Sequence, residues 1–218
     1  MKFFIDTANL DQIREAQDLG ILDGVTTNPS LMAKEGITGK QNILKHYKAI
    51  CDIVPGDVSA EVISTDYDGM MKEAGELAEI APNIVVKIPM IKDGVKAIAK
   101  LTELGIPTNC TLVFSVGQAI LAAKAGATYV SPFIGRIDDM NWNGMQLIHE
   151  ISEVYNVQLY ETEILAASIR NSKAIVESAA AGADVVTCPL NSILGLLKHP
   201  LTDIGLAQFL ADHKKGNE

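Results

Sequence analysis

The feature that most constrains the fold of this chain is an alternation, repeated eight times, of a short apolar segment with a longer amphipathic one. The short segments have the length and β-branched content of buried strands, and the longer ones carry apolar residues at helical spacing. We predict strands over residues 3–6, 24–27, 58–63, 84–88, 108–112, 129–132, 164–167 and 185–188. Eight βα units in 218 residues predict a single (β/α)8 TIM barrel over residues 1–218, with an open doubly wound sheet as the alternative.

Glycines mark several of the predicted helix ends. Gly105, Gly126 and Gly182 each follow an amphipathic segment and precede a strand, which is the position where glycine commonly ends a helix. After the eighth strand, residues 190–197 and 201–215 supply one more helix than the barrel needs. We expect residues 201–215 to form a C-terminal helix that packs on a neighbouring subunit.

Composition excludes several classes of function. The net charge is −9, and the basic residues are scattered, which argues against a nucleic-acid surface. Three widely separated cysteines indicate neither a disulfide framework nor a zinc site, so a reducing cytoplasm is expected. The uncharged stretch 104–123 contains too many polar residues for a membrane span, and we expect no membrane partner.

One lysine stands inside a strand that should be buried on both faces. Lys87 lies within the run Val85-Val86-Lys87-Ile88, where a lysine is unusual. Burial disfavours an ammonium ion, so an enclosed lysine can be a neutral amine that attacks a carbonyl and forms a Schiff base. The alternative is a lysine that extends its head to water.

Other polar residues recur at the carboxyl ends of the predicted strands, where the chemistry of a barrel collects. Several are two residues apart and therefore share one face of a strand. The set is Asp6, Asn28, Glu61, Asn109, Thr111, Ser131, Phe133, Ser168 and Arg170. Because the strands of a barrel have no solvated face, this pattern favours the catalytic interpretation of Lys87.

These groups suit the cleavage or formation of a carbon–carbon bond beside a ketone. A lysine imine is an electron sink, and one carboxylate can take the proton from a hydroxyl two carbons beyond the imine carbon. A second carboxylate can move protons through water while the carbinolamine forms and collapses. Asp6 and Glu61 are the candidates for these roles, and a capping or ion-pair role is the alternative for each.

Two arginines are candidates for binding phosphate. Arg136, together with Arg170 and Ser168, offers guanidinium forks and a hydroxyl at the barrel mouth. The alternative for Arg136 is a surface ion pair with Asp138 or Asp139. In the turn after the second strand, we predict that Ser30 caps the next helix.

Common cofactor and metal motifs are missing from the sequence. Gly39-Lys40 is followed by Gln41 and lacks the upstream glycine of a P-loop, and GxGxxG does not occur. The four histidines have no ligand spacing, so we expect neither a metal site nor a cofactor.

At seven places the sequence resembles the transaldolases, and in particular their short-chain subfamily, which also contains fructose-6-phosphate aldolases. The similar segments are 4–7, 24–30, 60–62, 86–89, 105–109, 131–137 and 166–171. The resemblance implies a metal-free class I transferase of the pentose phosphate pathway. Such an enzyme moves a dihydroxyacetone unit from sedoheptulose 7-phosphate or fructose 6-phosphate to an aldose phosphate.

The resemblance also implies roles for the residues. Lys87 matches the Schiff-base lysine, Asp6 the acid/base at the hydroxyl of the cleaved bond, and Glu61 the carboxylate that manages the catalytic water. Thr111 matches a threonine near that water. The remaining matches concern substrate: Asn28, Asn109 and Ser131 match residues that hold its hydroxyls, and Arg136, Ser168 and Arg170 match the phosphate site.

Two positions bear on the choice between transfer and release. The aldolase members resemble this chain but carry glutamine in place of Glu61 and tyrosine in place of Phe133. The tyrosine hydroxyl helps to protonate and release free dihydroxyacetone, and Phe133 has no such proton. The resemblance therefore favours a transaldolase, with an aldolase as the alternative. It also implies a homo-oligomer, typically a decamer of two pentameric rings.

Overall fold

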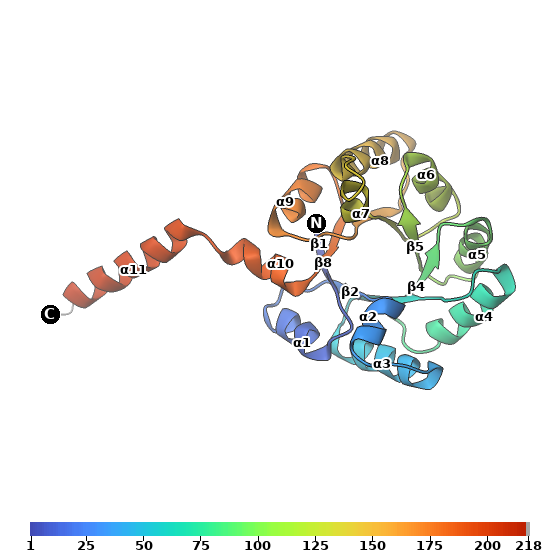
Figure 1. Cartoon of the computed structure of the whole chain (residues 1–218), viewed down its shortest axis with the longest axis horizontal. Coiled ribbons are helices and arrows are strands. Elements are labelled where there is room, and N and C mark those ends of the chain that lie inside the picture. Colours follow the sequence, from blue (N-terminus) through green and yellow to red (C-terminus); the bar gives the residue numbers. More distant parts are fainter. Residues whose placement is uncertain (217–218) are drawn as a thin grey trace.

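The computed structural model describes residues 1–216 and contains a closed barrel of eight parallel strands in the order β1 to β8, with helices around it (Figure 1). It is a (β/α)8 TIM barrel, as predicted, and the open sheet is excluded because β1 pairs with both β2 and β8. The strands are β1 Lys2–Asp6, β2 Gly24–Thr26, β3 Asp57–Glu61, β4 Ile84–Pro89, β5 Thr108–Val113, β6 Tyr129–Pro132, β7 Glu163–Ala166 and β8 Val185–Cys188.

Each strand was predicted in its place, with shifts of one or two residues at the ends. The helices are α1 Leu10–Asp18, α2 Pro29–Lys34, α3 Lys40–Ile53, α4 Tyr67–Ala78, α5 Lys92–Glu103, α6 Val116–Lys124, α7 Ile134–Asp138, α8 Gly144–Gln158, α9 Ser172–Ala180, α10 Leu190–Leu194 and α11 Pro200–Lys215, with a 3₁₀ turn at Gly195–Leu197.

Glycine ends three of the helices as predicted. Gly105, Gly126 and Gly182 have φ values of 71°, 87° and 93°, in the left-handed region that favours glycine. The prediction for α2 was wrong: its N-cap is Asn28, whose side-chain oxygen accepts from the backbone N–H of Leu31, and not Ser30.

Side chains close the amino end of the barrel. Lys2 forms an ion pair with Glu163 at 2.8 Å, and the hydroxyl of Tyr129 donates to Asp57 at 2.6 Å. Above them lies an apolar layer that includes Phe4, Val85, Leu165 and Val185. These side chains fill the amino-terminal half of the barrel interior, so a substrate pocket can form only at the carboxyl ends of the strands.

One glycine makes room for this layer. Gly24 faces the ring of Phe4, and a Cβ at this position would lie 2.5 Å from the ring atom Cζ. Any larger residue would force the ring to move, so the packing of β1 against β2 depends on this glycine.

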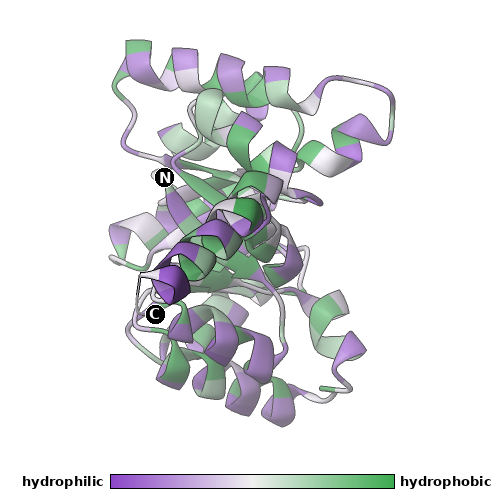
Figure 2. Ribbon diagram, turned by 90° about the vertical axis from the view of Figure 1, so that its left-hand side faces the viewer, coloured by the Kyte–Doolittle hydropathy of each residue, from purple (hydrophilic) through white to green (hydrophobic). Residues whose placement is uncertain are grey.

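Helix α11 extends away from the barrel (Figure 1), and none of its residues is buried. Its large apolar side chains are exposed; they are Leu201, Ile204, Leu206, Phe209 and Leu210. The colouring of Figure 2 shows hydrophobic and hydrophilic residues alternating along this helix. Within residues 1–216 no helix is long and apolar enough to span a membrane.

Candidate active site

A polar pocket of about 130 Å³ opens at the carboxyl ends of the strands. Asp6, Thr26, Asn28, Lys87, Ser131, Phe133, Arg136, Ala167, Ser168 and Thr187 line it. Seven of the residues singled out from the sequence are among them. The other four, Glu61, Asn109, Thr111 and Arg170, lie behind or beside the pocket wall.

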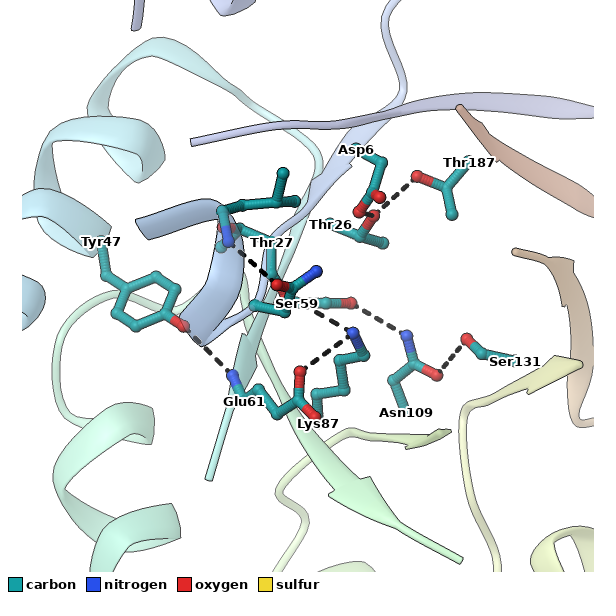
Figure 3. Close-up of polar contacts among 12 residues, drawn as sticks. Asp6, Thr26, Thr27, Tyr47, Ser59, Glu61, Lys87, Asn109, Ser131 and Thr187 are labelled. Atoms are coloured by element: carbon teal, nitrogen blue, oxygen red, sulfur yellow. Dashed lines mark hydrogen bonds and ion pairs between the residues drawn. The ribbon is translucent and has the colours of Figure 1, made fainter. Parts of the chain in front are cut away.

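Lys87 lies at the centre of this site. It lies within β4 and is only 5% exposed, and its Nζ is 3.1 Å from Oε2 of Glu61 (Figure 3). The same nitrogen donates to the backbone carbonyl of Thr27 at 3.5 Å. The amine is thus enclosed in the barrel, and the alternative in which it extends into bulk water is not supported.

Asp6 lies on β1 beside the lysine, and its carboxyl is held by a chain of hydroxyls. Thr26 donates to Oδ1 of Asp6 at 2.7 Å, and the hydroxyl of Thr187 is 2.7 Å from that of Thr26. Burial raises the pKa of Asp6, while the hydrogen bond from Thr26 and the charge of Lys87 oppose this rise. A carboxyl of this kind takes up a proton more readily than an exposed one.

A second hydrogen-bonded row crosses the barrel below the pocket. Asn109 is fully buried; its Nδ2 donates to Oγ of Ser59 at 3.1 Å, and its Oδ1 accepts from Oγ of Ser131 at 2.7 Å (Figure 3). Ser131 lines the pocket and Asn109 does not. The amide of Asn109 therefore acts on the pocket by fixing the hydroxyl of Ser131.

Thr111 is next to an irregularity in β5. The register between β5 and β6 shifts between Cys110 and Val113, and Leu112 has a φ of 61°. The hydroxyl of Thr111 is buried and has no hydrogen-bond partner in the structure. Buried hydroxyls normally have a hydrogen-bond partner, so that of Thr111 has capacity to bond a water or a polar ligand.

The candidate phosphate groups lie in two different settings. Arg136 lies over the ring of Phe133, with its Cζ 5.1 Å from the ring centroid, and lines the pocket with Ser168. Arg170 instead donates through both terminal nitrogens to the two carboxylate oxygens of Asp139, each at 2.6 Å. The ion pair considered for Arg136 with Asp139 is thus made by Arg170.

Three further interactions involve the residues around Arg170 and Phe133. The hydrogen bond from Arg170 lowers the pKa of Asp139. Oδ1 of Asp138 accepts from the backbone N–H of Gly144, so this carboxylate anchors the start of α8. The ring of Phe133 also packs edge-on against Phe114, with the centroids 6.0 Å apart.

Sequence reasoning missed four residues that support the site. Ser59 lies two positions before Glu61, and Thr26 lies two positions before Asn28, so each shares a face with a residue that was predicted. Thr187 is an inward-facing polar residue of β8. Tyr47 gave no signal, because it is an aromatic residue on the amphipathic helix α3. Within residues 1–216, no three His, Cys, Asp or Glu side chains are grouped to hold a metal ion.

A closed (β/α)8 barrel with a buried lysine in a polar pocket at the carboxyl ends of its strands has the architecture of a TIM-barrel enzyme. Solved structures agree on the fold. A thiamine phosphate pyrophosphorylase from Pyrococcus furiosus matches with a TM-score of 0.60 at 15% identity, over 85% of this chain and 84% of that one. A putative fructose-1,6-biphosphate aldolase from Coccidioides immitis matches with a TM-score of 0.58 at 12% identity, over 86% and 73%.

Sequence comparison is more specific. A protein named probable transaldolase from Cytophaga hutchinsonii is 70% identical over 217 residues, and a probable transaldolase from Parabacteroides distasonis is 68% identical; each match covers all of both chains. The model of the Transaldolase/Fructose-6-phosphate aldolase family matches residues 3–217. The chain belongs to this family of enzymes.

Proposed function

We propose that this protein is a transaldolase that transfers a dihydroxyacetone unit through a Schiff base on Lys87. The observation that carries the proposal is the enclosed amine of Lys87 in the pocket wall, 3.1 Å from the carboxylate of Glu61 and beside the half-buried carboxyl of Asp6. The donor is sedoheptulose 7-phosphate or fructose 6-phosphate. The acceptor is an aldose phosphate, either glyceraldehyde 3-phosphate or erythrose 4-phosphate.

The first step joins Lys87 to the donor. The neutral amine attacks the ketone carbon C2, and the carbinolamine loses its hydroxyl as water to give the imine. Glu61 is near enough to take a proton from the nitrogen and to return it to the departing hydroxyl, directly or through water. Thr111 is proposed to bond the water that leaves the carbinolamine, and its unpaired hydroxyl supports this role.

The second step breaks the bond between C3 and C4. The carboxylate of Asp6 takes the proton of the C4 hydroxyl, the electron pair of the broken bond flows into the imine, and an aldose phosphate leaves. The raised pKa of Asp6 supports this role, because the carboxyl can keep the proton until the acceptor aldehyde needs it. Ser131 and Asn28, which line the pocket, hold the hydroxyls of the sugar.

The enamine that remains on Lys87 has two possible fates. Protonation at carbon leads to release of dihydroxyacetone, and attack on an aldehyde leads to transfer. The pocket wall at this point is Phe133, whose ring carries no proton to give. This favours transfer over release, with aldolase activity as the alternative outcome.

The phosphate of each substrate is proposed to bind at the mouth, between Arg136, Ser168 and Arg170. Arg136 and Ser168 already line the pocket, and Arg170 is held close by through its pair with Asp139. The imine formed on Lys87 is the electron sink, so we propose that the reaction needs no metal. The proposed setting is the pentose phosphate pathway in the cytoplasm.

The test combines trapping with a product assay. Borohydride reduction in the presence of fructose 6-phosphate should leave a stable adduct on Lys87 that mass spectrometry locates, and Lys87→Met should leave none. With erythrose 4-phosphate present, transfer should be much faster than the appearance of free dihydroxyacetone. Absence of an adduct refutes the Schiff base, and equal release without acceptor refutes the transferase assignment.

We further propose that the protein is a homo-oligomer, a decamer of two pentameric rings, in which α11 packs on a neighbouring subunit. The support is the wholly exposed position of α11, with apolar side chains such as Leu206 and Phe209 more than half exposed. Such a surface is costly to leave in water.

A further inference from the structure

The hydrogen-bond ladder between β2 and β3 opens at the candidate active site. Thr26 pairs with Ser59, and the backbone N–H of Thr27 donates to the carbonyl of Ser59 at 3.4 Å. In a regular parallel ladder the next bond would run from the N–H of Glu61 to the carbonyl of Thr27. Instead, the N–H of Glu61 donates to the phenolic oxygen of Tyr47 at 3.2 Å (Figure 3).

The carbonyl that this exchange leaves free is the one that faces the lysine. The Thr27 carbonyl accepts from Nζ of Lys87 at 3.5 Å, and the carboxylate of Glu61 is 3.1 Å from the same nitrogen. Two acceptors thus reach Lys87 from the edges of the opened ladder. The Thr27 carbonyl is available to Lys87 because the N–H of Glu61 has a partner other than Thr27.

Tyr47 is built into the fold as a fixed group. It lies on α3, its exposed fraction is only 2%, and burial raises its pKa to about 12, so the phenol stays neutral over the working range of an enzyme. With Glu61 it lines a separate pocket of about 210 Å³ between α3 and α4. The phenol therefore reaches Glu61 from the side of the barrel away from the substrate pocket.

We propose that Tyr47 is a positioning residue: its phenolic oxygen holds the β2–β3 ladder open, so that the Glu61 carboxylate and the Thr27 carbonyl both face Lys87. The proposal rests on the proposed Schiff-base function of Lys87. It assigns Tyr47 no contact with substrate. Its effect on the reaction passes entirely through Glu61 and Thr27.

The test is Tyr47→Phe, which keeps the ring and removes only the oxygen. The N–H of Glu61 is then free to bond the Thr27 carbonyl, which closes the ladder and takes that carbonyl from Lys87. We expect kcat for transfer to fall about tenfold, the effect of one lost hydrogen bond to a charged group, with KM for fructose 6-phosphate within about twofold.

The matched control is Tyr155→Phe. Tyr155 is also a buried helical tyrosine, and its hydroxyl donates to the carbonyl of Ala119 at 2.7 Å, in the packing of α8 on α6. This variant should lose a similar amount of thermal stability and keep kcat. Equal kcat values for the two variants, or a loss confined to stability, would overturn the proposal.

Two further measurements separate a positioning role from general damage. Glu61→Gln already lacks the carboxylate, so adding Tyr47→Phe to this variant should lower kcat by much less than tenfold. A further tenfold loss of kcat would contradict the proposal. A crystal structure of Tyr47→Phe should have the Glu61 N–H bonded to the Thr27 carbonyl. If Glu61 and Thr27 keep their places beside Lys87, the inference is wrong, whether or not the protein is a transaldolase.

Discussion

Gly135→Ala should weaken the binding of phosphorylated substrates selectively. Gly135 lies on α7, directly against the loop that carries Ser168 and Arg170. A Cβ at this position would be 2.3 Å from the carbonyl oxygen of Ser168 and 2.9 Å from Nε of Arg170. Ordinary contact begins near 3.4 Å, so the loop must retreat by about 1.1 Å.

The loop has little freedom to absorb this movement. Ser168 already has a φ of 60°, a left-handed conformation that is costly for a residue other than glycine, and Arg170 is fixed by its two bonds to Asp139. A displacement of roughly 1 Å at a binding group can cost up to about a hundredfold in rate. We expect kcat/KM for fructose 6-phosphate to fall about ten- to a hundredfold, or about 1.4–2.7 kcal/mol.

The assay compares phosphorylated substrates with their unphosphorylated counterparts. The loss should appear in KM for fructose 6-phosphate and be much smaller for fructose, because in the proposed binding mode only the phosphate contacts Ser168 and Arg170. Gly117→Ala is the matched control: Gly117 is also a helical glycine, on α6, but a Cβ there meets no atom within 4 Å. A Gly135→Ala protein that keeps KM for fructose 6-phosphate, or loses both sugars equally, would show that phosphate binds elsewhere.

Three other predictions test the remaining parts of the site and the assembly. The raised pKa of Asp6 means that the folded state binds its proton more tightly than the unfolded state, so stability falls as pH rises from the ordinary carboxyl range through that raised value. Asp6→Asn should therefore raise the melting temperature at pH 8, with a smaller gain at pH 4, while transfer is lost; no gain at pH 8 would contradict the electrostatic argument. Phe133→Tyr should increase the share of free dihydroxyacetone among the products, and an unchanged share removes the main argument for transfer over release. Phe209→Lys on the exposed face of α11 should reduce the oligomer size in analytical ultracentrifugation, with Gln208→Lys as the control, and an unchanged size would exclude α11 from the interface.

Much of the site could be predicted because the alternation of side chains along a strand shows which residues share a face. Alternation with period two places Asp6, Lys87 and Ser131 on the inner face of the barrel whatever the rest of the chain does. The carboxyl ends of parallel strands meet at one end of the barrel, so polar residues there come together even though they are far apart in sequence. Knowledge of eight strands was enough to bring these residues to one pocket.

Sequence reasoning left the partner undecided where a side chain has several within reach. Asn109 shares the inner face of the barrel with Lys87, but its amide is bonded by Ser59 and Ser131 and lies below the pocket. Arg170 takes the carboxylate of Asp139, which the sequence offered equally to Arg136. Such choices depend on differences of about an ångström in the positions of whole elements, which no local pattern encodes.

The number and order of the βα units and the inner face of each strand follow from the sequence alone, because short-range periodicity and glycines at helix ends encode them. The hydrogen-bond partner of the Glu61 backbone N–H, in contrast, is set by the tertiary structure. That bond joins α3 to the end of β3 across 14 positions of the chain, at the point where β2 ends. Long-range register sets the distance between Tyr47 and Glu61, and no feature of either segment alone predicts it.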